Sequence, residues 1–184
     1  KNSGTLGRLI LGLLINTSYP IKIIGDKSLS KRDFKRIADP LSKFGAKFKL
    51  NKNKNLPLII NGSDNLKPFK YTENKGSAQC KSSVILGGMR TKGTTIIKAK
   101  KSRNHTELLC KYLKLPIKIK RTKKNDEIKI QKVKAIKRLN YNIPSDISSS
   151  AFFIVLTALS NNSQLTIKGV NINPSRIGVI TILK

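Results

Sequence analysis

The sequence has no tryptophan, and aromatic residues make up only 5% of its 184 residues. Proteins that bind RNA or single-stranded DNA commonly stack bases on aromatic side chains, so this scarcity argues against that class. Acidic residues are scarce as well: 9 Asp and Glu stand against 38 Lys and Arg, and the formal net charge is +29. This charge favours phosphorylated or polyanionic partners. However, the lysines are spread along the whole chain together with many Asn and Ile residues, which indicates a compositional bias.

Side chains that could hold a metal ion are also few, because the chain has 2 cysteines and 1 histidine. Cys80 and Cys110 form no CxxC pair, so we expect reduced thiols in the core and no zinc site. The apolar runs LILGLLI and AFFIVLTAL are shorter than the roughly 20 residues that cross a bilayer. We therefore expect a cytoplasmic protein that binds no metal and does not enter a membrane.

The two ends of the chain lack the features of a complete protein. It opens at KNSGT without a methionine and stops within SRIGVITILK, which has helical spacing. No signal peptide is visible. We expect this chain to be an internal piece of a longer protein.

Three passages of the chain follow one plan: a Gly- and Ser-rich start, an apolar helix, a β-branched strand and a second helix. Ser3 and Ser77 are 77 − 3 = 74 residues apart, and Ser77 and Ser149 are 149 − 77 = 72 residues apart. Such a regular interval indicates duplicated supersecondary units. The predicted helices cover residues 2–14, 31–45, 76–89, 104–115, 145–159 and 175–184, and the strands of the three passages cover 20–26, 94–100 and 164–170.

Two pairs of further strands lie between the passages, at residues 46–51 with 56–62 and at 116–122 with 126–133. Polar turn residues divide each pair, as in a β-hairpin. Each unit thus reads helix, strand, helix, strand, strand, and this order predicts an α/β fold with sheets packed on helices. The period is too long for a common solenoid, so we expect compact lobes built from a few such units.

The stretch KGSAQCKSSVILGGM, residues 75–89, begins with residues that helix N-termini favour. The first turn of a helix has unpaired backbone N–H groups and the positive end of the helix dipole, which attract anions. An ordinary capped helix is the simpler interpretation of any single start, but three starts recur here at equivalent positions. If the equivalent helices lie side by side, their N-termini form one electropositive surface for a phosphate or carboxylate substrate.

Five motifs occur in order along the chain, NSGTLGR, GDKSLSKRDF, GSAQCKSS, RNHTE and PSDISSSAFF, and NINPSRIG follows them. In this order and at these spacings they resemble the 5-enolpyruvylshikimate-3-phosphate synthase family over essentially the whole chain. The UDP-N-acetylglucosamine enolpyruvyl transferases share the fold but have a different run at the second helix start, so SAQ with RNHTE favours the shikimate enzymes. A relative of that second family is one alternative. A basic α/β nucleic-acid-binding protein without catalysis is the other, although the sequence shows no RNP, KH or helix-turn-helix pattern.

The resemblance implies a two-lobed enolpyruvyl transferase fold, an inside-out α/β barrel with three copies of such a unit in each lobe. Residues 1–143 would form most of one lobe, with two units, and residues 144–184 the crossover and the first part of a unit of the other lobe. The implied reaction of aromatic amino acid biosynthesis moves the enolpyruvyl group of phosphoenolpyruvate to the 5-hydroxyl of shikimate 3-phosphate. Phosphate leaves through a tetrahedral intermediate, without metal or organic cofactor. We expect no specific nucleic-acid partner, no membrane contact and a monomer when the protein is complete.

The resemblance also implies which residues hold shikimate 3-phosphate. Ser77, Ala78 and Gln79 match the run that binds this substrate, with Ser77 on its phosphate and Gln79 near both ligands. Arg103 matches a further phosphate contact in the enzymes that carry the RxHTE form. The family's catalytic carboxylates match no residue of this chain, so we expect it to carry half of the substrate cleft.

Gly4, Arg32 and Gln79 match phosphoenolpyruvate positions by the same resemblance. The glycine leaves room for the ligand, and an arginine suits its anionic groups because the guanidinium fork binds two oxygens. The family usually has proline where this chain has Asp33, which makes the local turn different. Lys81 is expected to be a solvated cation near the start of its helix.

Overall fold

The chain folds into two compact units in a computed structural model, which describes residues 2–183. Of the described residues, unit 1 contains 2–102 and 106–136, and unit 2 contains 103–105 and 137–183. The assignment of residues 1–143 and 144–184 to two lobes stays a prediction.

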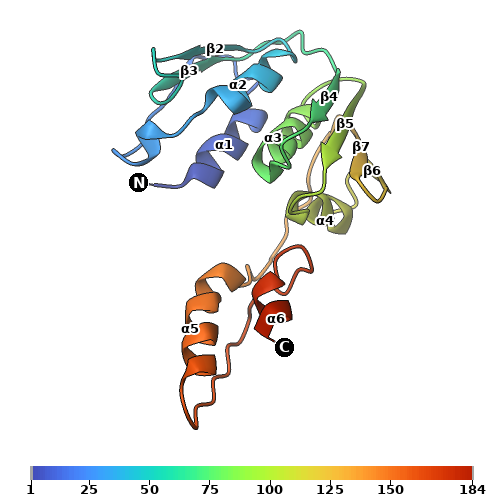
Figure 1. The fold of residues 1–184 in the computed structure, drawn as a ribbon. Helices are drawn as coiled ribbons and strands as arrows, with labels where there is room; N and C mark the ends of the chain where they lie inside the picture. The colour runs from blue at the N-terminus through green and yellow to red at the C-terminus, as the bar shows by residue number, and fades with distance from the viewer. Residues whose placement is uncertain (1, 184) are drawn as a thin grey trace. The chain divides into compact units, whose positions relative to one another are not determined.

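Unit 1 contains the predicted series of helix, strand, helix, strand, strand twice (Figure 1). The first series is α1 (Gly4–Leu13), β1 (Ile21–Ile23), α2 (Lys35–Ser42), β2 (Lys47–Leu50) and β3 (Leu58–Asn61). The second series is α3 (Ala78–Gly88), β5 (Thr94–Lys100), α4 (His105–Tyr112, in unit 1 from Thr106 onward), β6 (Ile117–Arg121) and β7 (Asn125–Gln131). The predicted α/β class is confirmed. The sequence did not predict the 3₁₀ turn η1 (Leu29–Lys31) and the short strand β4 (Lys70–Glu73), which forms by pairing with β5.

Two sheets of different topology form in unit 1. The first has three antiparallel strands in the order β1-β3-β2. The second has four strands in the order β4-β5-β7-β6, and β4 runs parallel to β5 while the other pairs are antiparallel. Along β7, Ile128 and Ile130 are buried whereas Lys129 between them is exposed. This alternation places one face of the sheet in the core and leaves lysines on the other face, in solvent.

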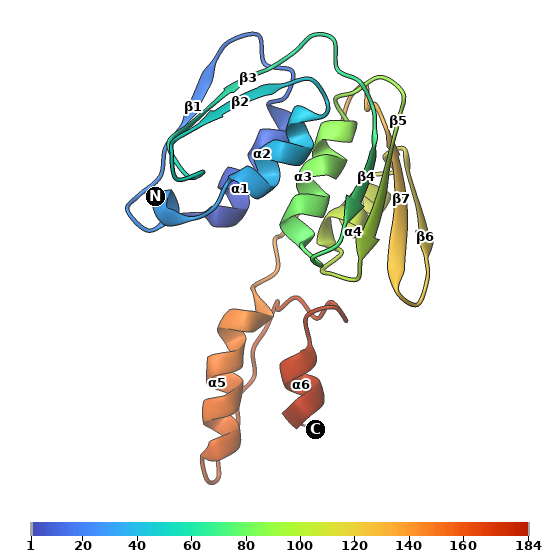
Figure 2. The same ribbon diagram turned by 45° about the horizontal axis from the view of Figure 1, so that its top comes forward.

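Helix α3 lies at the centre of unit 1, between the neighbouring helices α1 and α2 and the four-stranded sheet (Figure 2). Eight of its 11 residues are buried. A helix buried on every side is normally apolar all round, but α3 carries a lysine and two serines inside. Ser83 is satisfied by two backbone oxygens, since its Oγ lies 3.1 Å from the oxygen of Arg8 and 2.7 Å from that of Gln79. Polar residues are therefore admitted here where a partner is close.

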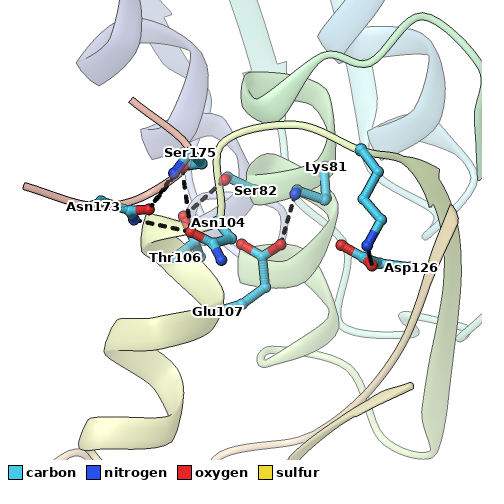
Figure 3. A network of polar contacts seen from close by, with 9 residues as sticks. Lys81, Ser82, Asn104, Thr106, Glu107, Asp126, Asn173 and Ser175 are labelled. Atoms are coloured by element: carbon cyan, nitrogen blue, oxygen red, sulfur yellow. Dashed lines mark hydrogen bonds and ion pairs between the residues drawn. The ribbon is translucent and has the colours of Figure 1, made fainter. Parts of the chain in front are cut away.

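Lys81 is not the solvated cation that the sequence predicts. Its side chain is fully buried, and its Nζ lies 2.6 Å from Oε1 of Glu107, whose side chain is 2% exposed (Figure 3). The hydroxyl oxygens of Ser82 and Thr106 are 2.7 Å apart and join the same two helices, α3 and α4. The prediction was wrong because α4 covers this face of α3 and supplies a carboxylate, without which a buried charge is very costly.

One hydrophobic cluster joins α1, α2 and α3 with both sheets. Cys80 and Cys110 lie in this cluster as free, buried thiols, as the sequence predicts. Burial raises the pKa of the Cys110 thiol to about 11, with a smaller contribution from Glu107. This thiol is therefore protonated at neutral pH and chemically quiet.

Unit 2 contains the helices α5 (Ile147–Leu159) and α6 (Gly178–Leu183). The strand predicted at residues 164–170 is wrong, because this segment has only an isolated bridge between Ser145 and Val170. Residues with high β-propensity form a strand when a neighbouring strand offers backbone partners. The described residues of unit 2 contain no such strand.

The regular interval between helix starts also ends in unit 2. Asp146 caps α5 and accepts a hydrogen bond from the backbone N–H of Ser148 at 3.0 Å. Ser149, which the interval predicts as the cap, lies inside the helix. From Ser77 to the observed cap is 146 − 77 = 69 residues. An aspartate three residues earlier is an equally good cap, so composition alone could not choose between them.

Removing one member of the buried Lys81–Glu107 pair should destabilise unit 1 strongly. In Glu107→Gln the ammonium of Lys81 stays buried without its counter-charge, and we expect a loss of roughly 3–5 kcal/mol in the free energy of unfolding. Lys81→Met combined with Glu107→Leu should recover most of this loss, because an apolar contact replaces two desolvated charges. Urea denaturation followed by circular dichroism measures both. A loss under about 1 kcal/mol in Glu107→Gln, the range of exposed pairs, would contradict the burial of this pair.

Candidate anion-binding site

Helices α1 and α3 run in the same direction, and their N-termini lie side by side. At the starts, Nε2 of Gln79 donates to Oγ1 of Thr5 at 3.0 Å; at the ends, Nε of Arg90 donates to Oδ1 of Asn16 at 2.9 Å. Both contacts join positions that are 74 residues apart, the interval between the first two repeats. The expectation that equivalent helix starts meet at one surface is therefore confirmed for these two helices.

A serine of the repeated motif caps each of the two helices. Oγ of Ser3 accepts from the N–H of Leu6 at 3.2 Å, and Oγ of Ser77 accepts from the N–H of Cys80 at 3.3 Å. Such a cap satisfies one N–H group of the first turn and leaves others for a ligand or water. Helix α2 also begins here, because Arg36 in its first turn reaches Ser77. Three helix starts thus meet in one place.

Arg8 connects these helix starts from a buried position. It is 9% exposed; its Nη1 donates to Oε1 of Gln79 at 2.8 Å, and its Nη2 donates to the backbone oxygen of Asp33 at 3.0 Å. The guanidinium lies 5.4 Å from the ring centre of Phe34, a favourable cation–π distance. Arg8 therefore fixes α3 and the turn before α2 relative to α1.

Arg36 makes a second connection, from α2 to the start of α3. Its Nη2 donates to Oγ of Ser77, and its Nε lies 3.5 Å from Sγ of Cys80. The thiol in turn lies 3.6 Å from the backbone oxygen of Arg36. An exposed arginine is held in one place by these contacts.

Gly4 leaves the space that the side chain of Arg32 occupies. A Cβ atom built on Gly4 would lie 2.7 Å from Nη1 of Arg32. Gly4 is buried at the start of α1, whereas Arg32 is exposed after the turn η1. The two residues therefore adjoin one another, although 32 − 4 = 28 positions separate them in the sequence.

The guanidinium groups of Arg8, Arg32 and Arg36 are not neutralised by the protein. Among the described residues, none of the three forms an ion pair with a carboxylate. Burial, and then the charges of Arg36 and Arg32, lower the pKa of Arg8 from its ordinary value of 12.5. The group still carries its proton at neutral pH. The lowered pKa therefore reports uncompensated positive charge, which a bound anion would relieve.

The site offers hydrogen-bond donors and cations, a set that binds and orients an anion. Within residues 2–183 there is no group of three or more His, Cys, Asp or Glu residues that could hold a metal ion. No helix in this described part is long and apolar enough to cross a bilayer.

The structure brings five residues predicted from the sequence to the joined helix starts: Gly4, Arg32, Ser77, Ala78 and Gln79. Their roles stay predictions. Arg103 is exposed and belongs to unit 2, so its part in this site also stays a prediction.

The sequence analysis missed Arg8 and Arg36. Arg8 lies four residues after Gly4 on the same helix, and residues at this spacing share one face. That spacing was an available signal. Arg36 had a weaker signal, since it begins a helix next to the predicted Arg32 but among four other charged residues of the run KRDFKR.

Comparison with known proteins identifies the family of this chain. The family model for EPSP synthase (3-phosphoshikimate 1-carboxyvinyltransferase) matches residues 1–184. The chain belongs to the EPSP synthase family. The resemblance carried by the five sequence motifs is thereby confirmed.

Relatives in the EPSP synthase family match the whole chain but are longer. A 3-phosphoshikimate 1-carboxyvinyltransferase from Leuconostoc mesenteroides is 41% identical over 184 residues, which are 100% of this chain and 42% of the relative. One from Caldicellulosiruptor bescii is 41% identical over 187 residues, covering 100% of this chain and 43% of the relative. The chain thus spans about two fifths of the length of the curated relatives it matches.

Solved structures show the same fold. An EPSP synthase from Acinetobacter baumannii matches with a TM-score of 0.82 at 35% identity, covering 98% of this chain and 40% of that one. The enolpyruvyl transferase NikO from Streptomyces tendae matches with a TM-score of 0.57 at 13% identity over 80% of this chain and 35% of that one, a likeness of fold alone. The predicted enolpyruvyl transferase fold is confirmed. These matches give no support to either alternative, the UDP-N-acetylglucosamine enzyme or the nucleic-acid-binding protein.

Gly4→Ala and Gly12→Ala make the same change near the two ends of α1 and should have different effects. At Gly12 the new Cβ would lie 2.3 Å from the backbone oxygen of Ser83, so α1 and α3 must part, and we expect a loss of about 1–3 kcal/mol in stability. At Gly4 the Cβ meets the flexible end of the Arg32 side chain, and alanine is favoured over glycine in a helix by up to about 1 kcal/mol. Thermal unfolding measures both. Equal destabilisation by the two changes would contradict the close approach of the helices at Gly12.

Proposed function

We propose that this chain is part of an EPSP synthase, which transfers the enolpyruvyl group of phosphoenolpyruvate to the 5-hydroxyl of shikimate 3-phosphate. Membership of the family and the names of its relatives support this proposal. The observation that carries it is the cluster of three arginines without carboxylate partners at the joined helix starts. Both proposed substrates carry a phosphate and a carboxylate, and helix N-termini with arginines suit such groups.

We assign shikimate 3-phosphate to the start of α3. The hydroxyl of Ser77 and the backbone N–H groups of the first turn, which begins at Ala78, are donors for its phosphate. The amide of Gln79 completes this part of the site. Arg103 is proposed as a further phosphate contact, on the basis of the family motif.

We assign phosphoenolpyruvate to the space beside Gly4. Arg32 adjoins this glycine, and its planar fork can bind two oxygens of a carboxylate or phosphate at once. Gln79 lies at the same helix starts, so it can contact both ligands. Holding two reactants in one geometry removes much of the entropic barrier to their reaction.

In the proposed reaction the 5-hydroxyl oxygen bonds to C2 of phosphoenolpyruvate, and the double bond takes up a proton. The resulting tetrahedral intermediate then loses phosphate, and the enol double bond forms again. The residues of this chain bind, orient and neutralise the anionic groups; proton transfer is assigned to the rest of the family's length. The absence of a cofactor and of a nucleic-acid partner, the monomeric state and the cytoplasmic location stay predictions.

The 184-residue chain alone should release no phosphate from phosphoenolpyruvate in the presence of shikimate 3-phosphate. It spans 42% of a curated relative, and the proton-transfer groups are assigned to the remainder. Joining it to the remaining segments of the family should restore turnover, which a phosphate-release assay measures. Steady release by the chain alone would refute the assignment of these groups, and no release by the completed protein would refute the proposed function.

Arg32→Lys in the completed enzyme should impair the use of phosphoenolpyruvate. The variant keeps the charge but loses the two-oxygen fork, so kcat/KM for phosphoenolpyruvate should fall about 10- to 100-fold, equivalent to one charge-assisted hydrogen bond. The KM for shikimate 3-phosphate should change little. Steady-state kinetics with each substrate varied gives both values. Arg90→Lys, beyond the other end of α3, is the matched control; an equal loss for both substrates in Arg32→Lys would show that Arg32 supports the fold instead.

A further inference from the structure

We propose that Arg8 and Arg36 are positioning residues that make Gln79 and Ser77 present hydrogen-bond donors, so that the start of α3 selects a phosphate over a hydroxyl group. This inference rests on the proposed function and concerns two arginines to which that function assigns no ligand. Each arginine occupies an acceptor of the residue beside it.

The hydroxyl of Ser77 has both of its acceptor positions filled. Nη2 of Arg36 donates to it from α2, and the backbone N–H of Cys80 donates to it from 3.3 Å. A serine hydroxyl has two acceptor positions and one proton. Among the described residues no acceptor takes that proton. Oγ of Ser77 can therefore only donate, and its proton is left for a ligand oxygen.

The amide of Gln79 is held in one of its two orientations. Nη1 of Arg8 lies 2.8 Å from one end of the amide, and Oγ1 of Thr5 lies 3.0 Å from the other. Because an arginine can only donate, the amide atom that faces it must be the oxygen. A rotated amide would bring two donors face to face. The second N–H of the amide has no acceptor among the described residues, so it too is left for a ligand.

Arg8 can impose this orientation because it is itself fixed. It is 9% exposed, and its Nη2 is anchored on the backbone oxygen of Asp33 at 3.0 Å. A buried guanidinium cannot turn to water for a replacement acceptor, and leaving a buried donor unpaired is costly. The contact with Gln79 is thus maintained.

A surface of donors favours phosphate for a physical reason. A phosphate dianion accepts on all its free oxygens, whereas a hydroxyl group has a proton of its own that needs an acceptor. At the start of α3 that proton would meet donors alone and stay unpaired. The two arginines should therefore increase the preference for shikimate 3-phosphate over shikimate, which has a hydroxyl group in place of the phosphate.

The test for Arg36 uses the full-length enzyme that contains this chain, with Arg36→Met, Arg36→Lys and the control Arg90→Met. Arg90 follows the other end of α3 and donates through Nε to Asn16 at 2.9 Å, so the control removes the same charge and a comparable hydrogen bond. Titration calorimetry gives the Kd of shikimate 3-phosphate and of shikimate for each variant. A general structural effect would weaken both ligands alike, and a general charge effect would act equally in the control.

Arg36→Met should lower the preference for shikimate 3-phosphate over shikimate by about tenfold, the equivalent of one charge-assisted hydrogen bond. Arg36→Lys should restore part of the preference, because an ammonium can still donate to Ser77. Arg90→Met should leave the ratio of the two Kd values unchanged. An unchanged ratio in Arg36→Met overturns the role of Arg36.

The test for Arg8 asks whether it acts through Gln79. Arg8→Met should weaken shikimate 3-phosphate about tenfold in the otherwise unchanged enzyme, and have little further effect when Gln79→Leu is already present. Equal effects in both backgrounds overturn the role of Arg8. If Arg8→Met does not fold, Gln79→Glu decides, since it keeps an acceptor for Arg8 but removes the donor; an unchanged affinity in that variant overturns the inference.

Failure of this inference and failure of the proposed function give different results. If the unsubstituted full-length enzyme shows no release of phosphate that depends on shikimate 3-phosphate, the proposed function fails and the inference falls with it. If that enzyme turns over and the variants keep the ligand preference, the inference alone fails.

Discussion

Helices α1 and α3 approach so closely that no Cβ atom fits between them at Gly12. A Cβ there would lie 2.3 Å from the backbone oxygen of Ser83, and one on Gly87 of α3 would lie 2.7 Å from a ring atom of Phe44. Dense packing of this kind gains dispersion energy and excludes water from both helices. Because the two helices are parallel at this distance, their N-termini are side by side, and every contact of the candidate site depends on that arrangement.

The central position of α3 also decides which polar residues it can carry. Ser83 uses backbone oxygens, and Lys81 uses the carboxylate of Glu107, so neither needs water. Ser77 and Gln79 differ because they stand at the first turn, where the helix has donors to spare. The same helix therefore serves as a core element over most of its length and as a ligand-binding element at its start.

The net charge of +29 gives little information about the site. Lysines on the outer face of the four-stranded sheet are solvated, and even directly opposed ones such as Lys118 and Lys129 are screened by water and salt. Arg8 is different because it is buried, where charges interact more strongly. A few arginines in defined contacts thus matter more to the proposed function than the many exposed lysines.

The sequence by itself determined the features that depend on neighbours along the chain. The repeated order of helices and strands, the serine caps at Ser3 and Ser77 and the family motifs could all be read from local patterns, because caps and periodicity act within a few residues. Where a pattern needed a distant partner, prediction failed, as with the strand at residues 164–170. Burial of Lys81 failed for the same reason, since the carboxylate that permits it lies on another helix.

Only the tertiary structure decided which helix starts meet and which side chains join them. The contact of Arg8 with Gln79 spans 71 positions, and that of Arg36 with Ser77 spans 41. No local pattern encodes such pairs, because they follow from how closely α1, α2 and α3 pack around Gly12. The donor surface at the start of α3 is therefore a product of packing: the sequence supplies the arginines, and the fold supplies the acceptors that they occupy.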